Sequence, residues 1–288
     1  MGFACTLASG SSGNAALFSH GDTHILVDMG ITYSRLCAQL GALGLSPREL
    51  AAVLVTHAHG DHVSGLSVLC RKQEAAARPA LVIAGAETAR TLARANPALK
   101  PFLRAYTAAF EIGGIAVEPF ATPHDAPGSA GYLLHMGGFR AAVGTDMGYV
   151  PPDALAKLSQ AHYILLEANH DTDMLRYGPY PAMLKRRVMG NAGHLSNDDC
   201  ARAAVHCVLR GAKRITLCHL SEDNNSPDLA LGTVAHALAE SGCEGFTLDV
   251  APRYDTGDPE YFGELSVMPG YEAASAPLRG SNAAGSLC

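Results

Sequence analysis

The stretch His57-Ala58-His59-Gly60-Asp61-His62 places four potential metal ligands within six residues. It follows the apolar, β-branched run 52–56, which predicts a buried strand, and it precedes a helix predicted to begin near Val63. Imidazole nitrogen and carboxylate oxygen suit zinc, iron and manganese, and a cluster without cysteine does not fit a closed structural zinc site. A solvated polar turn is the alternative. The density of histidine favours an open, catalytic metal site.

Three further candidate ligands stand where other apolar runs end. His124 follows a run ending at 121–122, Asp146 follows 142–145, and His219 follows 215–218. Taken singly, each would more often be a cap or a turn residue. Because one turn cannot complete two coordination shells, we expect all three to join the 57–62 cluster.

Short β-prone runs alternate with helical patterns nearly from end to end, which indicates an α/β fold. Helical spacing at Leu36, Leu40 and Leu43 ends at Gly44, and Ser46-Pro47-Arg48-Glu49 then resembles a helix-opening capping box. Strands are predicted over 81–84, 115–121, 131–135, 139–143, 163–166, 215–218 and 246–250. Helices are predicted over 85–95, 153–159, 181–189, 197–210 and 227–240, the fourth opened by a capping box at Ser196.

The composition is that of an ordinary globular protein, with 288 residues, 48% of them hydrophobic, and a formal net charge of −6. That charge argues against a polyanion-binding surface over the whole molecule. The eight cysteines are scattered without a CxxC pair, which favours free thiols in a reducing cytosol, and no stretch resembles a signal peptide or a membrane span. We therefore expect a cytoplasmic protein with one domain over 1–270 and a disordered tail over 271–288.

Together, the HxHxDH cluster and the later His, Asp and His resemble the metallo-β-lactamase superfamily. Within it, the chain is most similar to the YycJ/WalJ family, on the ribonuclease Z-like nuclease branch, and the similarity runs from about residue 3 to about residue 255. The matching motifs are Leu7-Ala8-Ser9-Gly10-Ser11-Ser12-Gly13-Asn14-Ala15, Leu54-Val55-Thr56-His57, Leu166-Glu167-Ala168-Asn169-His170-Asp171, Gly193-His194-Leu195-Ser196-Asn197 and His219-Leu220-Ser221.

This resemblance implies an αββα sandwich with two divalent ions, zinc or manganese, along one edge. One ion would be held by His57, His59 and His124, and the other by Asp61, His62 and His219. Asp146 would bridge the two ions, and a hydroxide between them would act as the nucleophile. Asp28, at the end of an early strand, matches a residue that orients a ligand histidine, and a simple turn cap is the alternative.

The leaving group of such a reaction needs an acid, and His194 is the candidate. Its Gly-His-Leu-Ser turn resembles the histidine motif of ribonuclease Z-like enzymes, in which a glutamate at a strand end orients the histidine; Glu167 holds that place here. A solvent-facing helix terminus is the alternative for His194. His170 could reach the metals, the substrate or only the surface, so we consider it together with Asp61, His194 and Glu167 as a catalytic candidate.

Two segments are candidates for substrate binding. Lys185-Arg186-Arg187, with Arg176, could form a basic ledge for a nucleic-acid backbone, although most basic triplets are solvated helix faces. The loop at 10–14 lacks the ending of a nucleotide P-loop, and we expect it to line the metal edge. Its Ser11, Ser12 and Asn14 could then approach a phosphate.

Three classes of function follow. A nuclease with exonuclease-like action on DNA or RNA is favoured by the resemblance. The alternatives are a small-molecule hydrolase, such as a lactonase or thioesterase, and a regulatory partner in cell-wall signalling. Between Asp146 and His219 we expect one strand and two helices, with no inserted domain or protruding arm, and hence an open, shallow groove. The sequence leaves the oligomeric state open.

Overall fold

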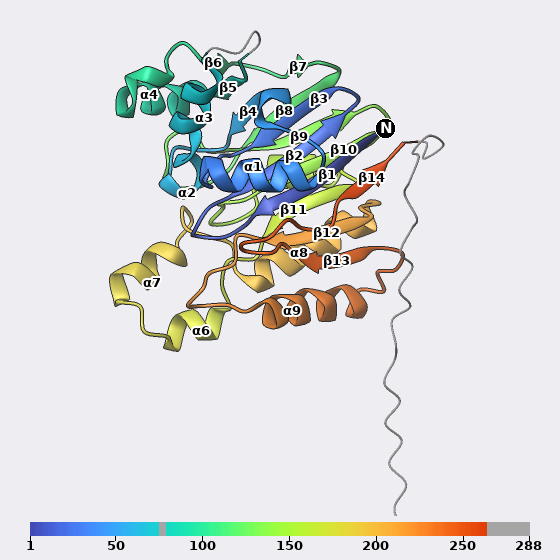
Figure 1. The fold of residues 1–288 in the computed structure, drawn as a ribbon. Helices are drawn as coiled ribbons and strands as arrows, with labels where there is room; N and C mark the ends of the chain where they lie inside the picture. Colours follow the sequence, from blue (N-terminus) through green and yellow to red (C-terminus); the bar gives the residue numbers. More distant parts are fainter. Residues whose placement is uncertain (75–78, 264–288) are drawn as a thin grey trace, which may run out of the picture.

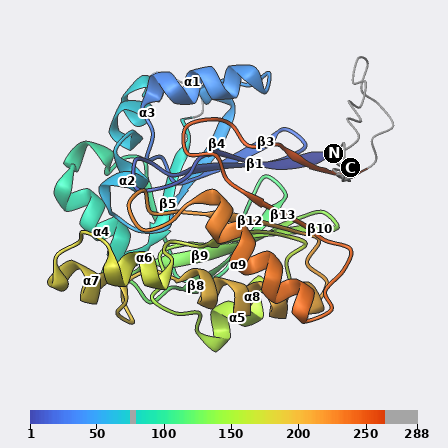
Figure 2. The same cartoon turned by 90° about the horizontal axis from the view of Figure 1, so that it is seen from below.

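A computed structural model describes residues 1–74 and 79–263, which form two packed seven-stranded sheets with helices on their outer faces (Figures 1 and 2). The expected αββα sandwich is confirmed. The first sheet has the order β14 (Glu260–Phe262), β1 (Gly2–Ala8), β2 (Ala15–His20), β3 (Thr23–Val27), β4 (Leu50–Val55), β5 (Leu81–Gly85) and β6 (Leu103–Tyr106). The second has the order β13 (Thr247–Val250), β12 (Arg214–Cys218), β11 (Tyr163–Glu167), β10 (Phe139–Gly144), β9 (Ala130–Met136), β8 (Ile115–Ala121) and β7 (Phe110–Ile112).

The helices divide between the two outer faces, as Figure 2 shows. The first sheet is covered by α1 (Tyr33–Ala42), α3 (Leu66–Gln73) and α4 (Ala86–Ala95), with the short α2 (Gly60–Val63) at its edge. The second is covered by α5 (Pro152–Leu158), α8 (Asn197–Leu209) and α9 (Pro227–Glu240). Among the described residues, no helix combines the length and the hydropathy needed to cross a bilayer.

Strand β4 shows why the core strands read as continuous apolar runs. Its Val53 and Val55 pack with the helices outside the first sheet, whereas Ala52 and Leu54 pack into the layer between the sheets. A strand buried on both faces needs apolar residues at every position. The run therefore ends only at Thr56, where the chain leaves the core and the histidine cluster begins.

Several predicted elements need correction. The capping box at Ser46 does form, but it opens only a 3-10 helix over Pro47–Glu49, because the β-branched run that follows pairs immediately into the sheet. The helix predicted near Val63 is divided into α2 and α3. Strands β1, β2, β6, β7 and β14 were not predicted, and the expected tail over 271–288 lies outside the described residues.

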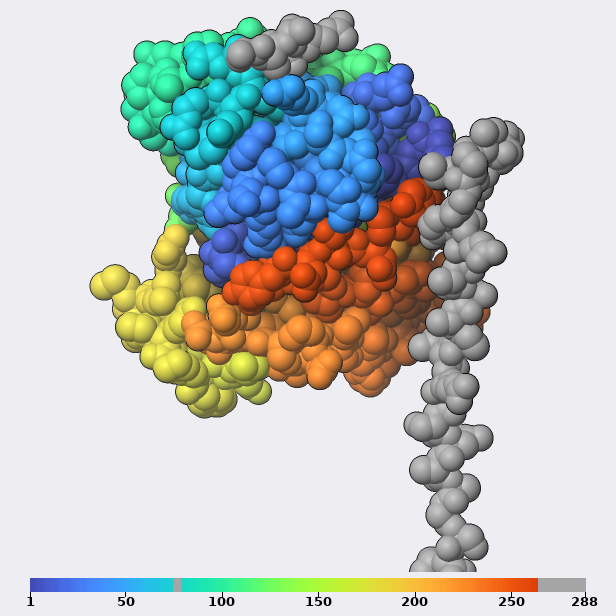
Figure 3. Space-filling view, in the orientation of Figure 1, coloured from blue at the N-terminus to red at the C-terminus, as the bar shows by residue number. Residues whose placement is uncertain are grey.

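The segment between Asp146 and His219 was also underestimated. Helices α5, α7 (Ala182–Val188) and α8 match the helices predicted over 153–159, 181–189 and 197–210, and the short α6 (Thr172–Tyr177) is additional. Residues 172–190, which include α6 and α7, project from the sandwich at the lower left of Figures 1 and 3. We call this segment the arm, and its presence overturns the expectation that the chain has no protruding arm.

Gly30 fixes how three loops meet at the sheet edge. Its N–H donates to the Asn14 carbonyl, the Asn14 N–H donates to the Asp61 carbonyl, and both hydrogen bonds are 2.8 Å long. A Cβ atom on Gly30 would lie 1.6 Å from the Asp61 carbonyl oxygen. Only glycine permits this approach, which holds the loop of the histidine cluster against the first loop of the chain.

We predict that Gly30→Ala lowers the free energy of unfolding by about 3 kcal/mol, because backbone has to move to accept the methyl group. Gly41→Ala is the control, since a Cβ atom there meets nothing within 4 Å on the exposed side of α1. It should raise stability by about 0.5–1 kcal/mol. Urea unfolding of both variants measures the difference, and equal midpoints would contradict the proposed role of Gly30.

Candidate metal centre

The centre lies where strands of both sheets end. Asp28 follows β3, His57 follows β4, Asp146 follows β10 and His219 follows β12. Among the described non-glycine residues, only Asp28, Asp146 and His219 have positive φ, with values of 61°, 58° and 58°. A left-handed backbone at such residues costs free energy and persists where the surroundings impose it. All three therefore mark turns that carry a side chain into the centre.

The seven expected ligands do converge. Candidate ligand atoms lie within 4.8 Å of one another in the groups His57, His59, His124 and Asp61, His62, His219, the sets that were expected to hold separate ions. Asp146 belongs to one group with His57 and His62 and to another with Glu167, His194 and His219. It therefore stands between the two sets.

Four of the histidines use Nδ1 for a hydrogen bond behind the centre. His62 bonds to Asp28 Oδ2 at 2.7 Å, His219 to Glu167 Oε1 at 3.1 Å, His124 to the Gly193 carbonyl at 3.0 Å and His57 to Thr56 Oγ1 at 3.1 Å. Such partners fix the tautomer and the ring orientation of a ligand histidine. Each ring thus keeps Nε2 for the centre, and Asp28 does contact a candidate ligand, as expected.

Buried atoms of the cluster fit a metal ion. Among the described residues, His57 Nε2 and Asp146 Oδ2 are buried without a hydrogen-bond partner, which is costly for polar atoms. Burial, followed by the neighbouring His62, lowers the pKa of His57 to about 2, so its imidazole is neutral and able to bind metal. Nitrogen and carboxylate donors without thiolate suit zinc or manganese. The residues present therefore fit a divalent cation.

His194 and Glu167 form the expected pair. His194 Nδ1 lies 2.8 Å from Glu167 Oε1, and Glu167 Oε2 accepts a 2.8 Å hydrogen bond from the Met147 N–H. Glu167 is fully buried. Burial opposes its charge, but His194 and the bonds from His194 and His219 lower the pKa of Glu167 to about 2. One carboxylate thus orients both a ligand histidine and the candidate acid.

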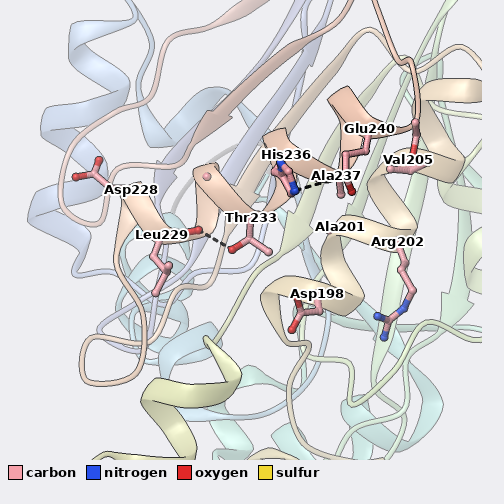
Figure 4. A pocket seen from close by; sticks show the side chains of 12 residues that line it. Asp198, Ala201, Arg202, Val205, Asp228, Leu229, Thr233, His236, Ala237 and Glu240 are labelled. Atoms are coloured by element: carbon pink, nitrogen blue, oxygen red, sulfur yellow. Dashed lines mark hydrogen bonds and ion pairs between the residues drawn. The ribbon is translucent and has the colours of Figure 1, made fainter.

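The cleft above this cluster has a volume of about 230 Å³. The arm supplies part of its lining, which the expectation of an open, shallow groove did not include. The metal edge supplies His59, Asp61, Asp146, His194 and His219; the surrounding loops supply Ser11, Asn169, Ser221 and Asn224; and the arm supplies Tyr180, Leu184, Arg187 and Val188. A larger hollow of about 790 Å³ lies between α8 and α9 (Figure 4), but it contains none of the metal-binding groups.

Other predicted residues are placed differently. His170 is 3% exposed and lies outside both the ligand groups and the cleft lining. Ser12 and Arg186 are exposed without lining the cleft, and Lys185 Nζ donates instead to the Arg176 carbonyl. Of the basic triplet, only Arg187 lines the cleft.

The 10–14 loop has two different roles. Ser11 lines the cleft, whereas Asn14 is buried beneath the ligand loop. Asn14 Nδ2 lies 3.2 Å from Asp61 Oδ2 and 3.1 Å from His62 Nε2. Asn14 thus supports candidate ligands rather than facing the cleft. Sequence reasoning also missed Tyr180 and Asn224, which have no periodic or spacing signal, and it quoted Asn169 in a family motif without giving it a role.

Comparison with known proteins gives consistent matches. The family model described as "Beta-lactamase superfamily domain" matches residues 23–220. A protein called exodeoxyribonuclease YycJ from Bacillus anthracis is 34% identical over 257 residues, which cover 87% of this chain and 96% of the relative. Exodeoxyribonuclease WalJ from Streptococcus pneumoniae is 34% identical over 260 residues, which cover 88% of this chain and 95% of the relative.

Solved structures resemble the fold at low sequence identity. The metallo-β-lactamase fold protein YhfI from Bacillus subtilis aligns with a TM-score of 0.68 and 16% identity, covering 90% of this chain and 99% of YhfI. The short form of human tRNase Z aligns with a TM-score of 0.62 and 17% identity, covering 89% of this chain and 98% of that protein. These two likenesses bear on the fold alone.

We predict that Asp28→Asn weakens zinc binding by about 10- to 100-fold, because the amide loses the charge that holds and polarises His62. Competition with a chromogenic chelator measures the affinity. Asp22→Asn is the control, since Asp22 is exposed on the turn after β2 and should leave the affinity unchanged. Equal affinities of Asp28→Asn and the unmodified protein would remove Asp28 from the support of the centre.

Proposed function

The chain belongs to the β-lactamase superfamily, and on that premise we propose that it is a cytoplasmic, metal-dependent nuclease that hydrolyses phosphodiester bonds of DNA. The observation that carries this proposal is the Glu167–His194 pair beside a seven-residue ligand cluster. A metal centre alone serves many hydrolytic reactions in this fold. A positioned proton donor is needed when the leaving group is a poor one, such as the sugar oxygen of a nucleic acid.

In this proposal the seven side chains would hold two divalent ions. Such ions would lower the pKa of a coordinated water and polarise the phosphoryl oxygens. Asp61 and Asp146 neutralise only part of the charge of two divalent cations, so a net positive centre would attract a phosphate despite the acidic composition of the chain. A single catalytic domain over 1–270 would contain the whole site.

His194 would donate the proton to the leaving oxygen. Its Nδ1 is held by Glu167, which leaves Nε2 available in the cleft that His194 lines. Burial opposes protonation of His194, but the Glu167 carboxylate outweighs it and raises the pKa of His194. A histidine that retains its proton near neutral pH is suited to act as a general acid.

The choice of DNA is supported by the relatives named exodeoxyribonuclease, which align over nearly their whole length. A small-molecule hydrolase is the second candidate. A cleft of about 230 Å³ lies below the usual volume of pockets that bind small ligands, so its size does not by itself require a polymer as substrate. The candidates differ in the leaving group or in the substrate. A lactonase also expels an alkoxide, whereas a thioesterase expels a thiolate that leaves without protonation. A proton-donating role of His194 therefore separates a nuclease from a thioesterase, and the use of DNA as substrate separates it from a lactonase.

We predict that His59→Ala and Asp61→Ala abolish hydrolysis while the fold is retained, because each removes a ligand from one of the two sets. Release of nucleotides from end-labelled single-stranded DNA, with zinc or manganese, measures activity, and circular dichroism checks folding. His236→Ala is the control, since His236 lies on the exposed side of α9. Full activity of metal-loaded His59→Ala would contradict the two-ion site.

We predict that His194→Ala lowers kcat on DNA by about 10²- to 10⁴-fold, with a smaller effect on KM. The loss should be much smaller on bis(p-nitrophenyl) phosphate, because nitrophenolate leaves without protonation. Equal losses on both substrates would exclude His194 as the acid. In that case the small-molecule alternative would gain support.

A further inference from the structure

The arm is weakly anchored by apolar contacts. Helix α7 buries none of its side chains, and α6 buries only Leu175. Met183 is 76% exposed and Tyr177 is 78% exposed. A segment with so few buried apolar groups has little intrinsic stability. Its position over the cleft therefore depends on the polar contacts that it makes with the rest of the molecule.

Two of these contacts join the arm to loops that carry candidate ligands. Tyr180 Oη donates to Asp223 Oδ2 at 3.0 Å, and Asp223 lies four residues after His219. Arg187 Nε donates to Asp125 Oδ2 at 2.6 Å, and Asp125 follows His124 directly. We call these two contacts the clasps. They join the arm to the protein through separate loops, each of which begins at the metal edge.

The clasps bear on how a polymer can enter. Both arm residues, Tyr180 and Arg187, line the same cleft as Ser11, His59 and Asp61. An internal stretch of a strand has to enter and leave, so it needs a groove that is open on two sides. A chain end needs only one opening. A cleft of about 230 Å³ lies below the range of about 300–1,000 Å³ that holds a small ligand, so it is too small to enclose two paired strands.

We propose that the Tyr180–Asp223 and Arg187–Asp125 clasps hold the arm against the metal centre and so restrict the substrate to the free end of a single strand. This inference rests on the proposed nuclease function. Of the clasp residues, Tyr180 and Asp223 give the clearer test of substrate specificity. Asp125 lies directly beside the candidate ligand His124, and the charge of Arg187 would also attract phosphate. Opening the Tyr180 clasp should admit internal segments.

The test compares linear and circular single-stranded DNA of the same sequence, since the circle has no end. The unmodified protein should degrade the linear form and leave the circle intact. Tyr180→Phe and Asp223→Ala should each raise the ratio of circle cleavage to linear cleavage at least about tenfold above the detection limit that the unmodified protein sets, the change expected when one hydrogen bond to a charged group is lost. The double variant should match Tyr180→Phe, because that substitution already removes the bond to Asp223 together with the contacts of Tyr180 with Ser221 and Asn224.

Tyr177→Phe is the matched control, since it removes a hydroxyl from the most exposed tyrosine of the arm and should leave the ratio unchanged. Hydrogen–deuterium exchange over 172–190 gives a readout that does not depend on activity. It should be faster in Tyr180→Phe than in Tyr177→Phe. An unchanged ratio or unchanged exchange in Tyr180→Phe would overturn the inference, as would cleavage of the circle by the unmodified protein.

Failure of the nuclease proposal itself would look different. In that case the metal-loaded, unmodified protein would not degrade the linear strand, whatever its action on bis(p-nitrophenyl) phosphate. If the linear strand is degraded but the Tyr180 and Asp223 substitutions do not change the ratio of circle cleavage to linear cleavage, the nuclease proposal stands. The proposed role of the clasps is then contradicted.

Discussion

The packing of the two sheets against each other is the constraint on which the candidate centre depends. His57, His59, Asp61 and His62 belong to the loop after β4 in the first sheet, whereas Asp146 and His219 end β10 and β12 in the second. The apolar layer between the sheets, with Phe18 and Leu54 facing Tyr132 and Leu134, sets the distance between these loops. A shift of one sheet would separate ligands that no local structure holds together.

Each sheet contributes a buried carboxylate behind the ligands. Asp28 from the first sheet holds His62, and Glu167 from the second holds both His219 and His194. These carboxylates fix rings that would otherwise have several rotamers, so the ordering cost is met when the chain folds rather than when a metal binds. The left-handed backbone at Asp28, Asp146 and His219 belongs to the same arrangement. It is tolerated because the sheets on both sides determine the path of the chain.

The centre was predictable from sequence to an unusual extent because its signal is local. Four candidate ligands stand within the six residues 57–62, and the others end apolar runs that are themselves recognisable as strands. The residues that support the candidate ligands were harder to predict from the sequence. Asn14 was expected to face a phosphate, yet it is buried against Asp61 and His62, which lie 47 and 48 residues further along the chain. No periodicity or composition reports a contact at that separation.

The contacts of the arm were equally difficult to predict from the sequence. They also show why the fold and the substrate specificity can depend on different residues. The Tyr180–Asp223 contact spans 43 residues and the Arg187–Asp125 contact spans 62. Neither contact is part of a sheet ladder or a helix, so neither leaves a pattern in the sequence. Because α7 adds no buried side chain to the core, substitutions in α7 change little of the apolar burial that stabilises the sandwich. The entrance to the cleft can therefore vary while the metal edge stays fixed, which is how one hydrolytic centre can serve substrates of different size and shape.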